Sequence, residues 1–118
     1  MKVQIKHVGQ AIVAELSGEI DTVDSEGLAD ALDEIVSQHP TRLVLDFSQV
    51  SYIASMGLSL LLKVAQEMRK TQGQLALVRV KPVVKLVLDT VCMGAVIPIE
   101  ATLEKALEKM DAKAPATV

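Results

Sequence analysis

The sequence predicts a single α/β domain with a mixed, mainly parallel sheet of about five strands, about four helices and an N-terminal antiparallel hairpin. Two observations lead to this fold class. Apolar stretches of strand length alternate with stretches in which apolar residues recur at helical spacing. The connections between them are short, which favours right-handed crossovers between parallel strands. Only the first two strands lack a helix between them, so these two are expected to pair antiparallel.

The first two strands are expected within residues 3–7 and 11–16. Residues 3–7 alternate between apolar and polar side chains, which is typical of a half-exposed edge strand. Gly9 and Gln10 separate this stretch from the more apolar residues 11–16. Because so short a loop joins the two strands, they should form a hairpin. We expect the second strand to end at residues 17–18.

The next two elements are a helix over residues 25–38 and a central strand over residues 43–47. Asp24 or Ser25 is expected to cap the helix, and Pro40 ends it. Residues 43–47 form a short apolar run, as expected for a strand that is covered on both faces. The helix residues expected to face the core are Leu28, Leu32, Ile35 and Val36.

A long amphipathic helix is expected after the loop that ends at Ala54. Its apolar periodicity begins at Met56 or Leu58, and Gly73 closes it. Charged and amide side chains occupy the opposite face, as in other helices that cover a sheet. The residues expected to face the core are Leu58, Leu61, Leu62, Ala65 and Met68.

The C-terminal part repeats this alternation of strand and helix. A strand is expected over residues 75–80, and Pro82 opens a helix that ends at Gly94. A short edge strand over residues 96–99 tolerates its proline, and a helix over residues 102–111 follows. The residues expected to face the core are Val84, Val87, Leu88, Val91, Leu103, Ala106, Leu107 and Met110, whereas Val83 and Leu86 point away from it.

Composition limits the class of protein. The chain has 118 residues, enough for one domain, which we place at residues 1–112 with a disordered tail at residues 113–118. The net charge of -3 comes without a basic stripe, so no nucleic-acid partner is expected. No apolar run reaches the roughly 20 residues of a membrane helix, so no membrane insertion is expected. The single cysteine, Cys92, cannot form an internal disulfide, and we expect a cytoplasmic protein that is monomeric when free.

The sequence carries no signature of a catalytic or metal site. It has no Gly-rich phosphate loop, no nucleophile elbow and no cluster of histidines and cysteines, so neither a cofactor nor a metal is expected. His39 is expected to be solvated at the end of a helix, and Cys92 to be a small buried apolar residue. A hydrolase using Ser55 would need a general base near it, such as His7 or His39, and the motif supplies none.

Ser55 has two interpretations, which the residues alone leave open. A serine directly before a helix is the ordinary N-cap, whose hydroxyl accepts a hydrogen bond from a free backbone N–H. The same position also suits a phosphoserine, because the first turn of a helix offers free N–H donors and the positive end of the helix dipole. Gly57 has no Cβ, so we expect it to let a partner approach the backbone closely.

Four segments of the chain resemble the STAS domain of bacterial anti-sigma-factor antagonists. Residues 16–21 resemble the family's Leu-x-Gly-Glu-Leu-Asp turn, and residues 44–53 resemble its third strand and following loop. Residues 55–58 resemble the Asp-Ser-Ser/Thr-Gly-Leu signature from its first serine onwards, and residues 93–99 resemble the Gly-Leu…Pro-Ile ending. The order and spacing of these segments are more specific than any one of them.

The resemblance implies a binding protein without catalysis of its own. Ser55 falls on the serine that a partner anti-sigma factor phosphorylates in this family; that partner is a serine kinase of the histidine-kinase-like ATPase fold. The unphosphorylated antagonist binds the kinase and frees the sigma factor, and a serine phosphatase resets the cycle. Asp21 and Asp46 match acidic positions of the family. We expect Asp21 near Ser55, and Asp46 to order the loop.

The chain departs from the family signature at two positions. Ala54 stands where an aspartate is usual, and Met56 stands where a second serine or threonine is usual. These departures favour an alternative function, a non-switching STAS module that serves as a subunit of a lipid-transport ATPase or as a signalling scaffold. For the switching function, the residues expected to contact the partner are Asp21, Ala54, Ser55, Met56, Gly57 and Ser59.

Overall fold

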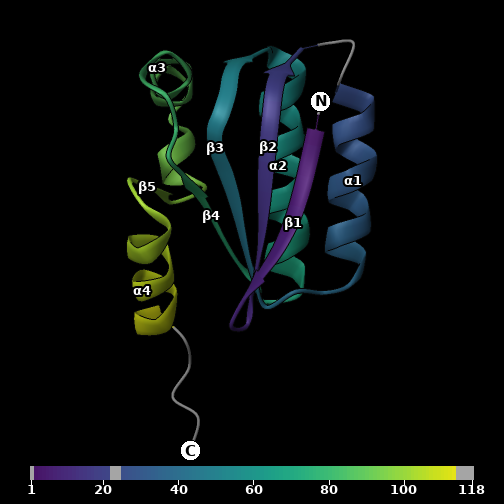
Figure 1. Cartoon of the computed structure of the whole chain (residues 1–118), viewed down its shortest axis with the longest axis vertical. Coiled ribbons are helices and arrows are strands. Elements are labelled where there is room, and N and C mark those ends of the chain that lie inside the picture. Colours follow the sequence, from purple (N-terminus) through teal and green to yellow (C-terminus); the bar gives the residue numbers. More distant parts are fainter. Residues whose placement is uncertain (1, 22–24, 114–118) are drawn as a thin grey trace, which may run out of the picture.

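In the computed structural model, which describes residues 2–21 and 25–113, five strands form one sheet in the order β1-β2-β3-β4-β5 (Figure 1). β1 and β2 pair antiparallel, and the other neighbours pair parallel. The fold class predicted from the sequence is therefore confirmed. The strands are β1 (Lys2–Val8), β2 (Ala11–Ile20), β3 (Arg42–Ile53), β4 (Gln74–Val78) and β5 (Ile99–Glu100).

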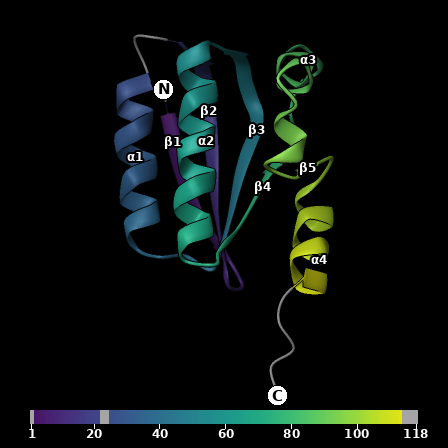
Figure 2. The same cartoon turned by 180° about the vertical axis from the view of Figure 1, so that it is seen from behind.

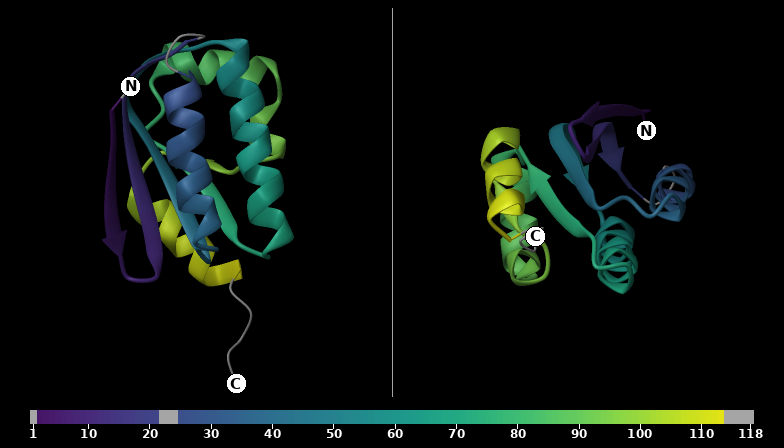
Figure 3. Two further views of the ribbon diagram at one scale, coloured as in Figure 1. Left: turned by 90° about the vertical axis from the view of Figure 1, so that its right-hand side faces the viewer. Right: turned by 90° about the horizontal axis from the view of Figure 1, so that it is seen from below.

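The helices cover both faces of the sheet. They are α1 (Ser25–Ser37), α2 (Ser55–Lys70), α3 (Pro82–Thr90) and α4 (Leu103–Lys113), with a short 3-10 turn at Met93–Ala95. α1 and α2 lie side by side over one face (Figure 2). α4 lies on the opposite side of the sheet from these two helices (Figure 3).

Alternate residues of β3 supply two separate cores. Leu43, Leu45 and Phe47 are fully buried in the large core under α1, α2 and α3. Val44 points to the other face and packs with Ala106 of α4. Because both faces of β3 are covered here, residues 43–45 are continuously apolar rather than alternating.

The hairpin is confirmed, but two strands are longer than predicted. Gly9 provides the positive φ of 58° that the tight turn between β1 and β2 requires. β2 continues past residues 17–18 to Ile20, and β3 continues past Phe47 to Ile53, where the sequence predicted a loop. The ends of β2 and β3 pair in parallel, but with two register shifts. Such irregularities interrupt the alternation of apolar and polar residues by which a strand is recognised in a sequence.

The start of α1 and the inward face of α2 also differ from prediction. Ser25 is the first residue of α1, so it is not the N-cap, and the alternative cap Asp24 lies outside the described residues. Leu62 is 40% exposed, whereas Leu60 and Val64 are buried. The buried stripe starts one position earlier, at the buried glycine of the first turn, and a glycine does not register in an apolar periodicity.

In the C-terminal part, β4, α3 and β5 are present but shorter than predicted. β4 ends at Val78 and α3 ends at Thr90. Val91 and Cys92 lie beyond α3, and both side chains are exposed, so the prediction that they are buried is wrong. Cys92 adopts a left-handed conformation (φ 57°) just beyond the helix, which turns it out of the core. The expected strand over residues 96–99 is wrong for residues 96–98, because β5 begins only at Ile99 and ends at Glu100.

The last helix is confirmed at its inward face, since Ala106 and Met110 are buried and Leu103 and Leu107 pack against them. α4 includes Lys113, and the rest of the predicted tail, residues 114–118, lies outside the described residues. No helix within residues 2–21 and 25–113 is long and apolar enough to cross a membrane.

Candidate phosphorylation and docking site

The ends of β2 and β3 support the start of α2. Ile20 and Ile53 are partners in the parallel ladder. One residue further on, the backbone N–H of Ala54 donates to the carbonyl oxygen of Ile20 at 2.7 Å. Asp21 and Ala54 are therefore the first residues beyond two paired strand ends. This arrangement brings Asp21 and Ser55 to the same end of the sheet, where β2 and β3 finish.

Ser55 is the first residue of α2 rather than its N-cap, so that interpretation is wrong by one position. Ala54 is the N-cap residue, with extended backbone angles (φ -94°, ψ 172°). Its methyl side chain accepts no hydrogen bond, and the helix starts without a side-chain cap. The hydroxyl of Ser55 is exposed and makes no hydrogen bond with any residue that the structure describes. It is chemically available.

The first turn of α2 suits an added anion at Ser55. The first N–H groups of a helix lack acceptors within the helix and carry the positive end of its dipole. Within residues 55–58, all of which the structure describes, no acidic side chain offsets that field. A phosphate on Ser55 would therefore meet helix N–H groups without repulsion from the first turn of α2.

Gly57 is buried, which contradicts the expectation that it opens the backbone to a partner. A Cβ at this position would lie 2.5 Å from Cγ2 of Ile20 and 2.8 Å from Cγ1 of Ile53. The missing side chain lets α2 approach the ends of β2 and β3 closely. Gly57 thus positions the helix that carries Ser55, and it belongs to the support of the site.

Two apolar side chains close to Ser55 in the sequence are exposed. Tyr52 is 51% exposed at the end of β3, and Met56 is 53% exposed in the first turn of α2. A shallow groove of about 210 Å³ runs from Met56 between α1 and α2; its lining residues are Glu26, Ala29, Met56, Ser59, Leu60 and Lys63. Sequence analysis pointed to Met56 and Ser59 but missed Tyr52, although it is one of only two aromatic side chains in the protein.

The two family aspartates have different surroundings. Asp21 is half-buried directly after β2, at the edge where α2 begins. Asp46 is 6% exposed within β3, and its carboxylate accepts a hydrogen bond from the N–H of Ser48 at 2.9 Å. Asp46 lies seven residues before Ile53, which is roughly 23 Å along an extended strand. It therefore orders β3 and has no contact with the site.

The histidines lie far from Ser55. His7 pairs with Ile12 near the hairpin turn, and His39 follows α1 just before β3 begins. Both therefore lie near the start of β2 and β3, at the opposite end of these strands from Ser55. The general base that a hydrolase would need is thus not supplied by either of them. Within residues 2–21 and 25–113 no group of histidine, cysteine, aspartate and glutamate side chains is arranged to hold a metal ion.

Comparison with known families agrees with this geometry. The model of the STAS domain matches residues 2–106. The chain belongs to the STAS domain family. Among its relatives, BtrV of Bordetella bronchiseptica, which bears the name of an anti-sigma factor antagonist, is 31% identical over 106 residues, spanning 90% of this chain and 91% of BtrV.

Solved STAS structures have the same fold. An anti-sigma factor antagonist from Mycobacterium paratuberculosis is 26% identical, with a TM-score of 0.86 over 93% of each chain. The phosphorylated form of the Bacillus cell fate determinant SpoIIAA is 24% identical, with a TM-score of 0.69 over 92% of this chain and 98% of SpoIIAA. The second likeness is one of fold alone.

Proposed function

We propose that this STAS domain is an anti-sigma factor antagonist that binds an anti-sigma serine kinase and is switched off by phosphorylation at Ser55. The observation that carries the proposal is the exposed, unbonded hydroxyl of Ser55 at the N-terminus of α2, next to the exposed Met56. Relatives that bear the name of anti-sigma factor antagonists support an anti-sigma factor as the partner. A serine phosphatase would restore the unphosphorylated state.

The switch works through charge. A phosphate adds about two negative charges at the helix start, where free N–H groups tolerate them. The same dianion would lie next to Met56, whose exposed apolar surface is a natural contact of a docked partner. Burying an uncompensated charge under such an interface costs several kcal/mol, enough to abolish micromolar affinity. Phosphorylation would therefore expel the partner and leave the domain folded.

The fold itself is compatible with a phosphorylated state, since SpoIIAA, which shares it, exists in a phosphorylated form. In this chain Ala54 removes a carboxylate that would repel the phosphate. Met56 removes an alternative phosphate acceptor and adds apolar contact area. Because of Met56, Ser55 is the single hydroxyl acceptor within residues 55–58.

The decisive experiment compares three variants for binding to the anti-sigma factor recovered from the native cell by pull-down and mass spectrometry. Ser55→Ala should bind like the wild type, and Ser55→Asp should lose binding. Gln66→Glu is the matched charge control, because it adds a negative charge to the exposed face of the same helix, roughly 16 Å from Ser55. Kinase and ATP should add one phosphate, and Ser55→Ala should accept none.

A folded Ser55→Asp protein that binds its partner at full affinity would contradict the charge mechanism. The same result would favour the alternative of a non-switching STAS module, whose binding to a transporter ATPase or scaffold would not depend on Ser55. Ala54 and Met56, the two departures from the signature, are the observations that keep this alternative open.

A further inference from the structure

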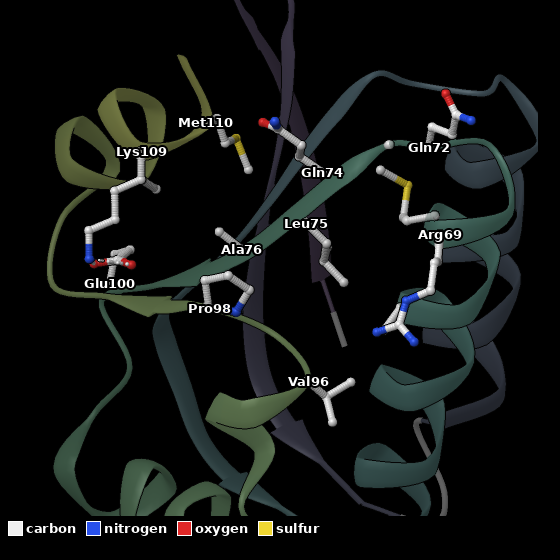
Figure 4. Close-up of a pocket in the computed structure, with 14 residues that line it drawn as sticks. Arg69, Gln72, Gln74, Leu75, Ala76, Val96, Pro98, Glu100, Lys109 and Met110 are labelled. Carbon is white, nitrogen blue, oxygen red and sulfur yellow. Dashed lines mark hydrogen bonds and ion pairs between the residues drawn. The ribbon is translucent and has the colours of Figure 1, made fainter. Parts of the chain in front are cut away.

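A second candidate site lies along the lateral edge of the sheet formed by β4 and β5, where β5 leaves most of β4 without a neighbouring strand. β5 pairs only with Leu77 and Val78. The first half of β4 borders a pocket of about 400 Å³ between the C-terminal part of α2, the segment before β5, and α4 (Figure 4). None of the residues proposed for the phosphorylation switch lines this pocket.

The edge of β4 presents unused backbone hydrogen-bonding groups. In a strand that lies between two parallel neighbours, successive residues direct their backbone N–H and C=O groups to one neighbouring strand and then to the other. The N–H of Gln74 donates to Thr41 before β3 at 2.8 Å, and the N–H of Leu77 donates to Pro98 at 2.9 Å on the other side. The backbone N–H and C=O of Leu75 point to the same side of β4 as those of Leu77, but β5 has no residue opposite Leu75. In the part of the chain that the structure describes, Leu75 therefore has no partner strand on that side.

The pocket has an apolar compartment on each face of this edge. Leu75 belongs to the core under α2 and borders the pocket there with Met68 and Val96. Ala76 points to the other face and borders the pocket with Met110 of α4. A strand added to an edge directs successive side chains to opposite faces. The two compartments match that alternation.

Polar groups without partners flank both compartments. Arg69 is exposed on α2, makes no ion pair with any described residue, and directs its guanidinium toward Leu75 and Val96 (Figure 4). The side-chain oxygen of Gln74 is buried without a hydrogen-bond partner in the described part of the chain. The cation of Lys109, by contrast, is paired with Glu100. The free charge at this site is thus positive, and it lies on the α2 side.

We propose that the open edge of β4 binds an extended peptide segment of a partner protein by strand addition. The segment alternates between the two faces, places apolar side chains in the compartment under α4 and an acidic side chain against Arg69, and pairs its backbone with Leu75. Backbone pairing gives such sites their affinity, and the side-chain compartments give them their specificity.

The test uses the blocked peptide acetyl-Thr-Val-Glu-Val-Thr-amide and the full chain, followed by NMR. Binding should be saturable, shift the resonances of Leu75 and Ala76, and slow hydrogen exchange of the Leu75 amide at least about tenfold at saturation. Arg69→Gln should weaken binding about tenfold, because a charge-assisted pair is lost. Lys70→Gln is the matched control: it removes the neighbouring charge, which pairs with Glu67 outside the pocket, and should leave binding unchanged.

Two altered peptides separate strand addition from simple apolar binding. N-methylation at alternate amides should abolish binding, and replacing the glutamate by lysine should reproduce the loss seen in Arg69→Gln. Equal binding of the N-methylated peptide would overturn the proposal. So would protection of the Leu75 amide that rises with protein concentration alone, which would identify a second copy as the occupant. Protection in the free chain that disappears on deleting residues 114–118 would identify the chain's own C-terminal residues and would also overturn it.

Discussion

The backbone N–H of Ala54 and the carbonyl oxygen of Ile20 form a 2.7 Å hydrogen bond that joins the start of α2 to the end of β2. This bond and the close packing of Gly57 against Ile20 and Ile53 hold the start of α2, and with it Ser55, firmly on the sheet. The hydroxyl itself takes no part in that support. A phosphate can therefore change the charge of the docking surface without removing any contact that holds the domain together.

Replacing Gly57 with alanine should destabilise the domain. The new Cβ would lie within 3 Å of both Ile20 and Ile53, two buried side chains that close the core beneath α2. Overpacking of this kind lowers the free energy of unfolding by about 1–3 kcal/mol. Urea unfolding followed by circular dichroism measures the change.

Gly27→Ala is the matched control for this substitution. Gly27 is also in the first turn of a helix, but no described atom lies within 4 Å of its hypothetical Cβ. Alanine there should raise the free energy of unfolding by about 0.5–1 kcal/mol, because it is the better helix former. Equal effects of the two substitutions would show that Gly57 is not closely packed.

Replacing Ala54 with aspartate or serine should stabilise the domain. Ala54 occupies the N-cap position with the extended backbone angles that a capping residue needs, but it has no side-chain acceptor. Either substitution supplies an oxygen for a free N–H of the first turn, and the free energy of unfolding should rise by about 1 kcal/mol. A gain with aspartate alone would show that the helix dipole, rather than the capping bond, is responsible.

The sequence was sufficient for the order of the elements, because hydrophobic periodicity and short connections leave few topologies open. It was insufficient at the ends of β2 and β3. There Ser48, Gln49 and Ser51 break the apolar pattern, yet the backbone continues to pair with the irregular end of β2. That pairing is a tertiary effect, and local composition carries little information about it.

The candidate site shows the same limit. Ser55 was placed within one residue of the start of the helix, because serine and the following periodicity are local signals. The burial of Gly57 and the exposure of Cys92 were missed. The first depends on how closely α2 approaches the sheet, and the second on a single residue with φ 57° after α3. Neither the approach nor the backbone angle is encoded in nearby residues.

Removal of the Asp46 carboxylate should destabilise β3. The carboxylate is almost fully buried and accepts the N–H of Ser48 at 2.9 Å. Asp46→Ala leaves that donor without its acceptor, so the free energy of unfolding should fall by about 1–3 kcal/mol. Asp46→Asn keeps an acceptor oxygen and should lose less than half as much.

Asp30→Ala on α1 serves as the control for Asp46, because Asp30 is exposed and its loss should change the free energy of unfolding by no more than about 0.5 kcal/mol. Urea unfolding compares the three variants, and hydrogen exchange of the Ser48 amide reports on the bond itself. If Asp46→Ala left both quantities unchanged, the carboxylate would have no structural role.

Leu61 and Leu62, adjacent on α2, should respond very differently to truncation. Leu61 is 1% exposed in the large core, whereas Leu62 is 40% exposed on the outer face of the helix. Leu61→Ala should lower the free energy of unfolding by about 2–5 kcal/mol, because it removes buried methyl groups and leaves a cavity. Leu62→Ala should change it by no more than about 0.5 kcal/mol, since little buried surface is lost. Because both substitutions have the same helix propensity, their difference in urea unfolding isolates burial, and equal losses would mean that α2 is rotated about its axis relative to the sheet.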